Sequence, residues 1–312
     1  MPDADYRAGS SMELYRQGKV KKVWIVDDDT FEFEFTNNIS VFDKIIPSDI
    51  PFKGETLCRT SAYWFKLCEE AGIKTDFKKL VGGDRMRVKR VNVIPDYSKL
   101  NHKTTNYLIP LEFICRHYNA GSMNDRIKDG EIKPEELGYP KGHVPAYGEK
   151  LPRKFFETTT KLEKVDRNLT REEAIQISGL TEKEYDHVFD VISTIDDIIA
   201  KEVGSRGLIH VDGKKEFAYD EKRNLMIVDT FGTLDEDRWW DKAQYEQGKM
   251  VELSKEMVRQ YYRDIGYHEK LMKARKLKQL EPDIPPLPKE KVEEVSQLYI
   301  GLFERMTGQK FR

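Results

Sequence analysis

The sequence predicts an α+β fold, because segments with strand periodicity and segments with helix periodicity both occur along the chain. Residues 21–35 contain two strand-like runs around an Asp-rich turn, and the second run, FEFEF, alternates apolar and polar side chains. From Gly54 to Ala71 the apolar residues instead recur every three or four positions, and Gly72 ends this helical pattern. Residues 86–94 alternate again and predict another strand.

A long helix and a helical tail are expected in the second half of the chain. Residues 181–184 resemble a capping box, and apolar residues continue at helical spacing through Ile199. The segments GLIHVD and NLMIVDTF predict two strands joined by the turn YDEKRN. The tail from Val251 is expected to be helical, with an interruption at 284–288 and a last helix from about residue 289 to 306.

Size and composition exclude several classes of protein. A chain of 312 residues, 38% hydrophobic and 35% charged, can bury more than one small core. Its net charge of -2 argues against a surface built for nucleic acid or for an anionic membrane. The three cysteines lack metal-site spacing, so we expect reduced thiols and a cytoplasmic location. No apolar run approaches the roughly 20 residues that a membrane span needs, and residues 1–10 contain no signal-peptide core.

The segment LIPLEFICRHYNAGS, residues 108–122, combines a strand-like run with a small-residue turn. Exposed amides of the turn, the hydroxyl of Ser122 and the forked guanidinium of Arg116 could surround one anion. Alternatively, Arg116 could pair with Glu112 and close an ordinary turn. The residues alone leave both interpretations open.

The segment GKVKK, residues 18–22, precedes a strand and could bind phosphate. Alternating Lys19 and Lys21 beside a glycine can present two ammonium groups and backbone amides to a polyphosphate. Such a segment is more often a solvated turn.

Acidic residues of VDGKKEF and IVDTF could form a cation site. Side chains alternate in a strand, so Asp212, Lys214 and Glu216 should share one face, with Asp229 close to Glu216 on the partner strand. Mg²⁺ prefers such oxygen ligands and leaves room for phosphates. A solvated ladder of cross-strand charges is the alternative.

The segment LDEDRWWDK, residues 234–242, places Arg238 beside two tryptophans. Arg238 could bind an anion, held by aromatic packing, or the segment could begin a helix with acidic residues in its first turn.

Together these segments resemble the phosphoribosylaminoimidazole-succinocarboxamide synthase (SAICAR synthetase) family of purine biosynthesis. The strongest match is the segment at 108–122, which is similar to the family pattern P-[LIVM]-E, two apolar residues, R, three residues, A-G-S. Other segments match in the same order along the chain: GKVKK, ISVFDKIIPSDIPFKGETL, FETTTKLEKVD, DGKKEF, DTFGTLDEDRWW and the closing helices.

The resemblance implies an N-terminal β-rich domain over residues 1–107 on the ATP side and an α+β domain over 108–250 with substrate and metal residues. Residues 251–312 would add C-terminal helices packed on the second domain. ATP would lie in the cleft between the domains. The partners would be the imidazole ribonucleotide and L-aspartate, with no nucleic acid, no membrane and a possible homo-oligomer.

The resemblance also implies roles for individual residues. On the nucleotide side, phosphates would contact Lys19, Lys21 and Lys89, and Mg²⁺ would contact Glu216 and Asp229. The ribose 5'-phosphate of the imidazole substrate would be bound by Arg116, Ser122 and Arg238. The reacting carboxylate would lie against the catalytic pair Lys214 and Asp212, and the aspartate side would include Ser40 and Asp43.

Several residues depart from the family pattern in the wall around the metal and substrate. A glutamate of the pattern is Thr230, and the proline and two serines before the arginine are Leu234, Glu236 and Asp237. Further departures are Ala218 for glycine and Lys215 for an apolar residue. If Glu236 and Asp237 point inward they would repel a phosphate. These changes motivate two alternatives, a ligase for another carboxylate or amine and a catalytically silent nucleotide-binding homologue.

Overall fold

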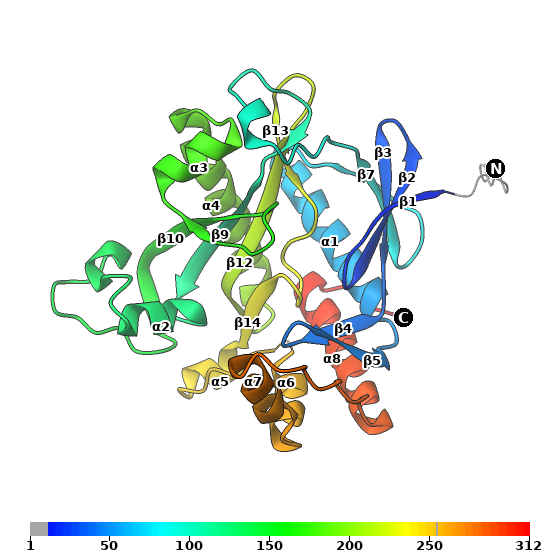
Figure 1. Cartoon of the computed structure of the whole chain (residues 1–312), viewed down its shortest axis with the longest axis vertical. Coiled ribbons are helices and arrows are strands. Elements are labelled where there is room, and N and C mark those ends of the chain that lie inside the picture. Colours follow the sequence, from blue (N-terminus) through cyan, green and yellow to red (C-terminus); the bar gives the residue numbers. More distant parts are fainter. Residues whose placement is uncertain (1–11, 254) are drawn as a thin grey trace.

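The computed structural model describes residues 12–253 and 255–312 and has the expected α+β fold. The expectation about residues 1–10 lies outside this part of the chain. An antiparallel five-stranded sheet, in the order β1-β2-β3-β7-β6, forms the N-terminal part (Figure 1). Its strands are β1 (Glu13–Gln17), β2 (Lys21–Asp27), β3 (Thr30–Phe35), β6 (Phe77–Leu80) and β7 (Arg85–Lys89), and β4 (Asn38–Val41) pairs with β5 (Lys44–Asp49) beside it.

A second, larger sheet has the order β11-β10-β9-β12-β13, and β14 and β8 also pair with β12. Its strands are β8 (Tyr107–Leu108), β9 (Leu111–Tyr118), β10 (Lys150–Thr160), β11 (Asn168–Leu169), β12 (Leu208–Tyr219), β13 (Leu225–Val228) and β14 (Asp237–Asp241). β12 is central and touches β9 on one side and β14 on the other. This position lets β12 place side chains next to residues from several strands.

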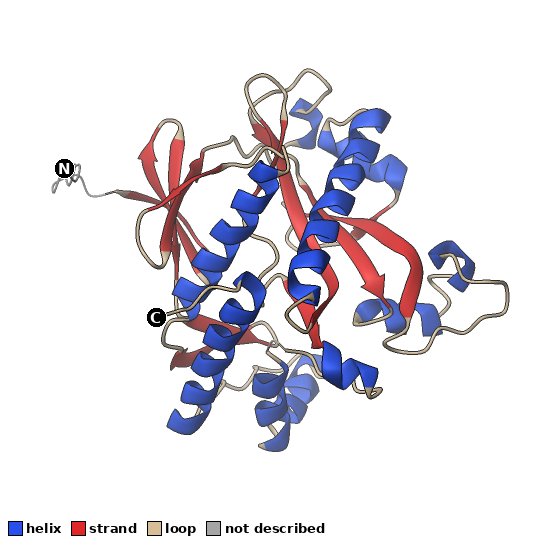
Figure 2. Ribbon diagram, turned by 180° about the vertical axis from the view of Figure 1, so that it is seen from behind, coloured by secondary structure: helices blue, strands red, loops and turns tan. Residues whose placement is uncertain are grey.

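Two long helices, Lys53–Glu70 and Glu182–Gly204, lie across the sheets on the side seen in Figure 2. The helices are α1 (Lys53–Glu70), α2 (Ser122–Lys128), α3 (Arg171–Ser178), α4 (Glu182–Gly204), α5 (Lys242–Glu246), α6 (Glu256–Asp264), α7 (Tyr267–Lys276) and α8 (Lys289–Thr307), with short 3-10 turns η1 (Tyr97–Lys99) and η2 (Pro134–Leu137). The predicted capping box of α4 is present, since the Thr181 hydroxyl accepts a hydrogen bond from the Glu184 amide at 3.2 Å and the Glu184 carboxylate accepts one from the Thr181 amide at 2.8 Å.

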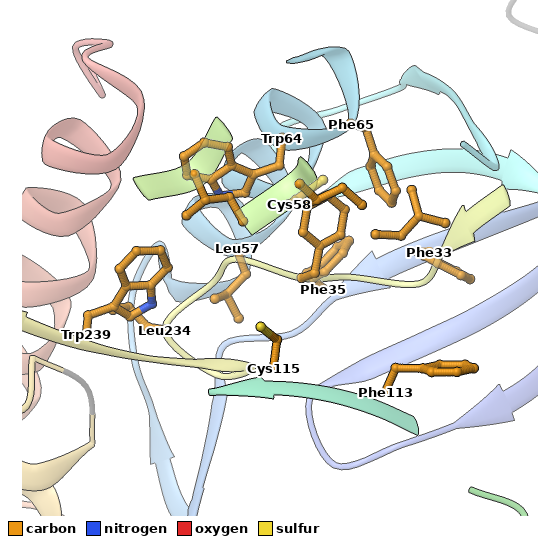
Figure 3. Packing of buried hydrophobic residues seen from close by; sticks show 14 of the residues in the cluster. Phe33, Phe35, Leu57, Cys58, Trp64, Phe65, Phe113, Cys115, Leu234 and Trp239 are labelled. Carbon is orange, nitrogen blue, oxygen red and sulfur yellow. The ribbon is translucent and has the colours of Figure 1, made fainter. Parts of the chain in front are cut away.

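One hydrophobic core joins the two sheets. Trp64 and Phe65 of α1 are almost fully buried against Phe33 and Phe35 of the first sheet (Figure 3). The same cluster continues to residues of the second sheet and of α8: Phe113, Cys115, Trp239, Tyr299 and Leu302. Each large apolar side chain buried in this way contributes about 1.5–3 kcal/mol. The shared core fixes the position of one sheet relative to the other.

Two sequence expectations need correction. The strand expected at 86–94 ends at Lys89, and only an isolated bridge at Asn92 follows. The stretch 124–153, expected to be irregular, includes most of α2 and the first residues of β10. The start of β10 depends on pairing with Tyr118 of β9, which lies far from Lys150 in the sequence. Among the described residues, no helix is long and apolar enough to cross a membrane.

Candidate active site

A cavity of about 290 Å³ lies between the two sheets, and we call it the intersheet cavity. Apolar side chains from both sheets form one part of its wall: Val23, Phe31, Phe33, Val88, Val91, Val93, Leu108 and Val228. Charged side chains form another part: Lys19, Lys21, Lys89, Lys161, Glu216, Asp229 and Glu236. An apolar wall joined to a group of lysines and carboxylates suits a ligand with a flat apolar portion and a charged portion.

The carboxylates of Glu216 and Asp229 lie together in this cavity, and each pairs with a lysine. The Lys161 ammonium is 2.6 Å from Glu216 Oε1, and Lys21 from the first sheet pairs with Asp229. Asp229 directly follows β13 with a positive φ of 63°, an uncommon conformation for a residue with a side chain. The strand register brings the two acids together, because Glu216 lies opposite Val228, the last residue of β13 and the one before Asp229.

Burial and neighbouring charge shift the pKa values of these acids. Burial, with the nearby charge of Asp229, raises the pKa of Glu216 to about 6. Burial alone would raise the pKa of Asp229 too, but the ammonium groups of Lys21, Lys161 and Lys214 together outweigh it and lower that pKa. Burial raises the pKa of Glu236 to about 7, and Asp229 and Glu216 add to the rise while Lys214 opposes it. Such a concentration of negative charge suits a hard divalent cation with oxygen ligands.

A second group of residues gathers around Asp212, which we call the arginine cluster: Arg116, Gly121, Ser122, Asp212 and Arg238. Asp212 lies opposite Arg116 on β9 and opposite Arg238 on β14. Arg238 Nη1 donates to Asp212 Oδ2 at 2.5 Å, and Arg116 Nη1 is 3.6 Å from the same oxygen. Arg116 Nη2 also lies 3.5 Å from the Ser122 hydroxyl. The family resemblance grouped Arg116, Ser122 and Arg238 at one phosphate, and the structure brings these three residues together around Asp212.

Glu236 connects the two groups. It lines the intersheet cavity and also a smaller cavity of about 160 Å³ whose wall includes Asp212 and Arg238. Thr230 donates a hydrogen bond to Glu236 at 3.4 Å. Glu236 therefore lies between two sites. One is the group of carboxylates in the intersheet cavity, and the other is the arginine cluster.

The alternation expected for β12 is present. The ammonium of Lys214 lies 3.1 Å from Glu112 Oε1, on the face of Asp212 and Glu216. The intervening Lys215 is fully buried on the opposite face and pairs with Asp196 of α4 at 2.5 Å. Lys215, which replaces an apolar residue of the family pattern, therefore lies on the face of β12 that points away from the site.

The remaining predicted residues lie nearer the first sheet. Lys19 and Lys89 both line the intersheet cavity, and Lys89 pairs with Asp29 and Glu221, each at 2.6 Å. The exposed carboxylate of Asp43 lies 3.2 Å from Lys19. Ser40 lies in β4, where it pairs with Ile45 of β5.

Three alternatives drawn from the sequence are settled by the strand geometry. The pairing of Arg116 with Glu112 is wrong, because residues four apart in a strand lie about 13 Å apart, and Arg116 Nε instead donates to Glu157 at 2.7 Å. A helix starting within residues 234–242 is wrong for Arg238, which belongs to β14. Asp237 does not face the arginine cluster, since its buried carboxylate pairs with His210 and accepts a hydrogen bond from the Gly232 amide.

Several charged residues of the site had no predicted role: Lys161 and Glu157, and also Arg16 and Asp76 in the wall of the intersheet cavity. Lys161 belongs to the FETTTKLEKVD segment and follows the end of β10 directly. Glu157 accepts hydrogen bonds from Arg116 and Arg126. Only the T-T-K-x-E part of the family resemblance pointed toward Lys161.

The comparison with known proteins agrees with this geometry. The sequence pattern described as SAICAR synthetase matches residues 14–274. The chain belongs to the SAICAR synthetase family. The phosphoribosylaminoimidazole-succinocarboxamide synthase of Thermoplasma volcanium is 54% identical over 300 residues, which covers 96% of this chain and 100% of that protein. As a member of the SAICAR synthetase family, the chain is an enzyme of purine biosynthesis, an ATP-dependent ligase.

Solved structures of SAICAR synthetases have the same fold. The Saccharomyces cerevisiae SAICAR synthase complexed with SAICAR superposes with a TM-score of 0.74 at 23% identity, covering 96% of each chain. A SAICAR synthetase in complex with ADP superposes with a TM-score of 0.67 at 25% identity, covering 96% of this chain and 100% of the other. The α+β fold with two sheets is therefore that of the family.

Proposed function

We propose that this enzyme joins L-aspartate to the carboxylate of carboxyaminoimidazole ribonucleotide and converts ATP to ADP and phosphate, giving SAICAR. The observation that carries the proposal is the position of Glu236 in the walls of two cavities. A nucleotide in the intersheet cavity would direct its phosphates toward the arginine cluster, where the second substrate would lie. The ADP complex of a relative supports nucleotide binding by this fold.

On the nucleotide side, the apolar wall would hold the adenine ring and Lys19, Lys21 and Lys89 would hold the phosphates. Lysine suits this role because its ammonium is a compact charge on a flexible stem. Residues 1–107 would form this side of the cleft. The carboxylates of Glu216 and Asp229 would hold Mg²⁺, which supplies charge neutralisation to the phosphates when it is bound.

On the substrate side, Arg116, Ser122 and Arg238 would bind the ribose 5'-phosphate. Two guanidinium groups offer forked donors that match phosphate oxygens. A bound phosphate would replace the hydrogen bond from Arg238 to Asp212 and the ion pair between Arg116 and Asp212. Residues 108–250 would supply this side. Residues 251–312 would add helices that pack on both sides of the cleft rather than on the second domain alone, since α8 contacts chiefly α1 and also α4.

The reaction requires activation of a carboxylate, which is a poor electrophile in water. Transfer of the terminal phosphoryl group of ATP to a carboxylate oxygen forms an acyl phosphate, and the aspartate amine then displaces phosphate. Lys214 and Asp212 would lie against the reacting carboxylate, and Ser40 and Asp43 would lie on the aspartate side. The contribution of the protein is positioning and stabilisation of charge.

Product formation tests this proposal directly. Purified enzyme should release ADP only when the imidazole nucleotide, aspartate and Mg²⁺ are all present. ATP turnover that is indifferent to aspartate would reject the proposal. A panel of other carboxylic acids tests whether the departures from the family pattern at Thr230 and Glu236 change the substrate. Faster turnover with another acid would identify a related ligase instead.

We also propose a cytoplasmic enzyme with small-molecule partners and no nucleic-acid partner. Its three cysteines are free and buried, which suits a reducing compartment. A homo-oligomer is part of this proposal, and sedimentation would test it.

A further inference from the structure

Lys161 is a largely buried lysine in the wall of the intersheet cavity. It lies one residue beyond β10, its side chain is only 16% exposed, and it lines the intersheet cavity. Its ammonium is 2.6 Å from Glu216 Oε1, and that carboxylate is only 11% exposed. Lysine carries about 2 kcal/mol of rotamer entropy, so holding it here needs a specific partner.

The charges around Lys161 are mainly negative. Glu216 is its direct partner, and the carboxylates of Asp229 and Glu112 also act on it. Lys21 from the first sheet pairs with Asp229. Two lysines from opposite walls thus each neutralise one of the two carboxylates assigned above to the metal.

The ion pair between Lys215 and Asp196, which we assign a structural role, differs from the Lys161–Glu216 pair in its burial. Lys215 and Asp196 are both fully buried between β12 and α4. Lys161 and Glu216, in contrast, form part of a cavity wall that a ligand can reach. A lysine beside a carboxylate in such a wall can exchange that partner for a phosphate oxygen.

We propose that Lys161 is a further catalytic residue, which exchanges Glu216 for the terminal phosphoryl group of ATP. This inference rests on the proposed function. When the ammonium binds a phosphate oxygen, Glu216 becomes available to a divalent cation. Binding of the cation and of the nucleotide is then coupled, and each strengthens the other by the same factor.

Full-length protein and three variants test the exchange: Lys161→Met, Lys161→Gln and the control Lys164→Met. Lys164 is an exposed lysine of the same segment. Binding of Mn²⁺ alone is measured by electron paramagnetic resonance. Binding of the non-hydrolysable ATP analogue β,γ-imido-ATP and of ADP, each with Mg²⁺, is measured by titration calorimetry. Removal of Lys161 should strengthen binding of Mn²⁺ alone and weaken binding of the ATP analogue, each about tenfold, and should change ADP binding less because ADP lacks the terminal phosphoryl group. The control should match the wild-type protein in all three measurements.

Kinetics separate this role from a structural one. Loss of a group that stabilises charge in the transition state should lower kcat about 100-fold with a smaller change in KM. The Gln variant still offers a hydrogen bond to Glu216, so it covers the case in which the Met variant does not fold. Variants that keep wild-type kcat and wild-type affinity for Mn²⁺ and the ATP analogue would overturn the proposal.

The outcomes also separate this inference from the proposed function. If the wild-type protein forms SAICAR and the Lys161 variants form it equally fast, the role of Lys161 is wrong and the function stands. If the wild-type protein forms no SAICAR, the function is wrong, and the opposite changes in affinity for Mn²⁺ and for the ATP analogue still decide the exchange.

Discussion

Arg238 donates a hydrogen bond to Asp212 across the β12–β14 pair, with 2.5 Å between Nη1 and Oδ2. Arg116 approaches the same carboxylate from β9, on the other side of β12. One aspartate thus holds two guanidinium groups at a distance suited to a shared anion. The ribose phosphate that we assign to this cluster would compete with Asp212 for both arginines.

Replacement of Arg116 tests the cluster. Arg116→Ala should remove about 2–5 kcal/mol of binding free energy for the imidazole nucleotide, and Arg116→Lys should restore only part, because an ammonium lacks the fork. Affinity is measured by calorimetry and folding by thermal unfolding. Glu157 keeps its contact with Arg126, so the fold should survive. A lower unfolding temperature with unchanged affinity would assign Arg116 a structural role.

Gly121 has a steric role that alanine cannot fill. A Cβ atom at residue 121 would lie 2.6 Å from both terminal nitrogens of Arg238, and the φ of +57° is unfavourable for alanine. Gly121→Ala should therefore displace Arg238 and raise KM for the imidazole nucleotide about tenfold or more. Gly130→Ala is the matched control, with a φ of +75° and open space around its Cβ position. Equal KM in the two variants would disprove the steric account.

Glu236 should make stability depend on pH. Its pKa rises from 4.5 to about 7 on folding, so its protonated form stabilises the fold at low pH and this contribution is lost as the pH rises through 7. Glu236→Gln should stabilise the protein by about 1–2 kcal/mol at about pH 8, after allowance for partial exposure, and by less at about pH 5. Urea unfolding measures this, with the exposed Glu246→Gln as control. A gain that is equal at both pH values would contradict the assignment.

The buried pair of Lys215 and Asp196 should be costly to break singly. Burial opposes both charges. Attraction by Lys215, with help from His210 and His117, nevertheless lowers the pKa of Asp196, and attraction by Asp196, with help from Asp237, raises the pKa of Lys215. Lys215→Met should cost about 3–5 kcal/mol in urea unfolding, because Asp196 loses its main partner. The double variant Lys215→Met/Asp196→Leu should lose less than the sum of the single changes. Additive losses would show that the two side chains are not coupled.

The sequence could predict what depends on local periodicity. The alternation of β12 put Asp212, Lys214 and Glu216 on one face, and the capping residues marked the start of α4. Local periodicity could not predict the partners on strands that are distant in the sequence. Glu157 and Arg116, for example, meet only through the register of β9 and β10. Lys161 was missed for a related reason, since it lies in a bend beyond β10 and meets Glu216 only in the folded sheet.

The central claim is that ATP phosphorylates the substrate carboxylate at the junction of the two cavities. The imidazole nucleotide labelled with oxygen-18 in its carboxylate tests this claim most directly, by mass spectrometry of the released phosphate. One labelled oxygen should appear in the phosphate for each SAICAR formed, because the acyl phosphate carries that oxygen away. Phosphate without label during SAICAR formation would contradict the claim.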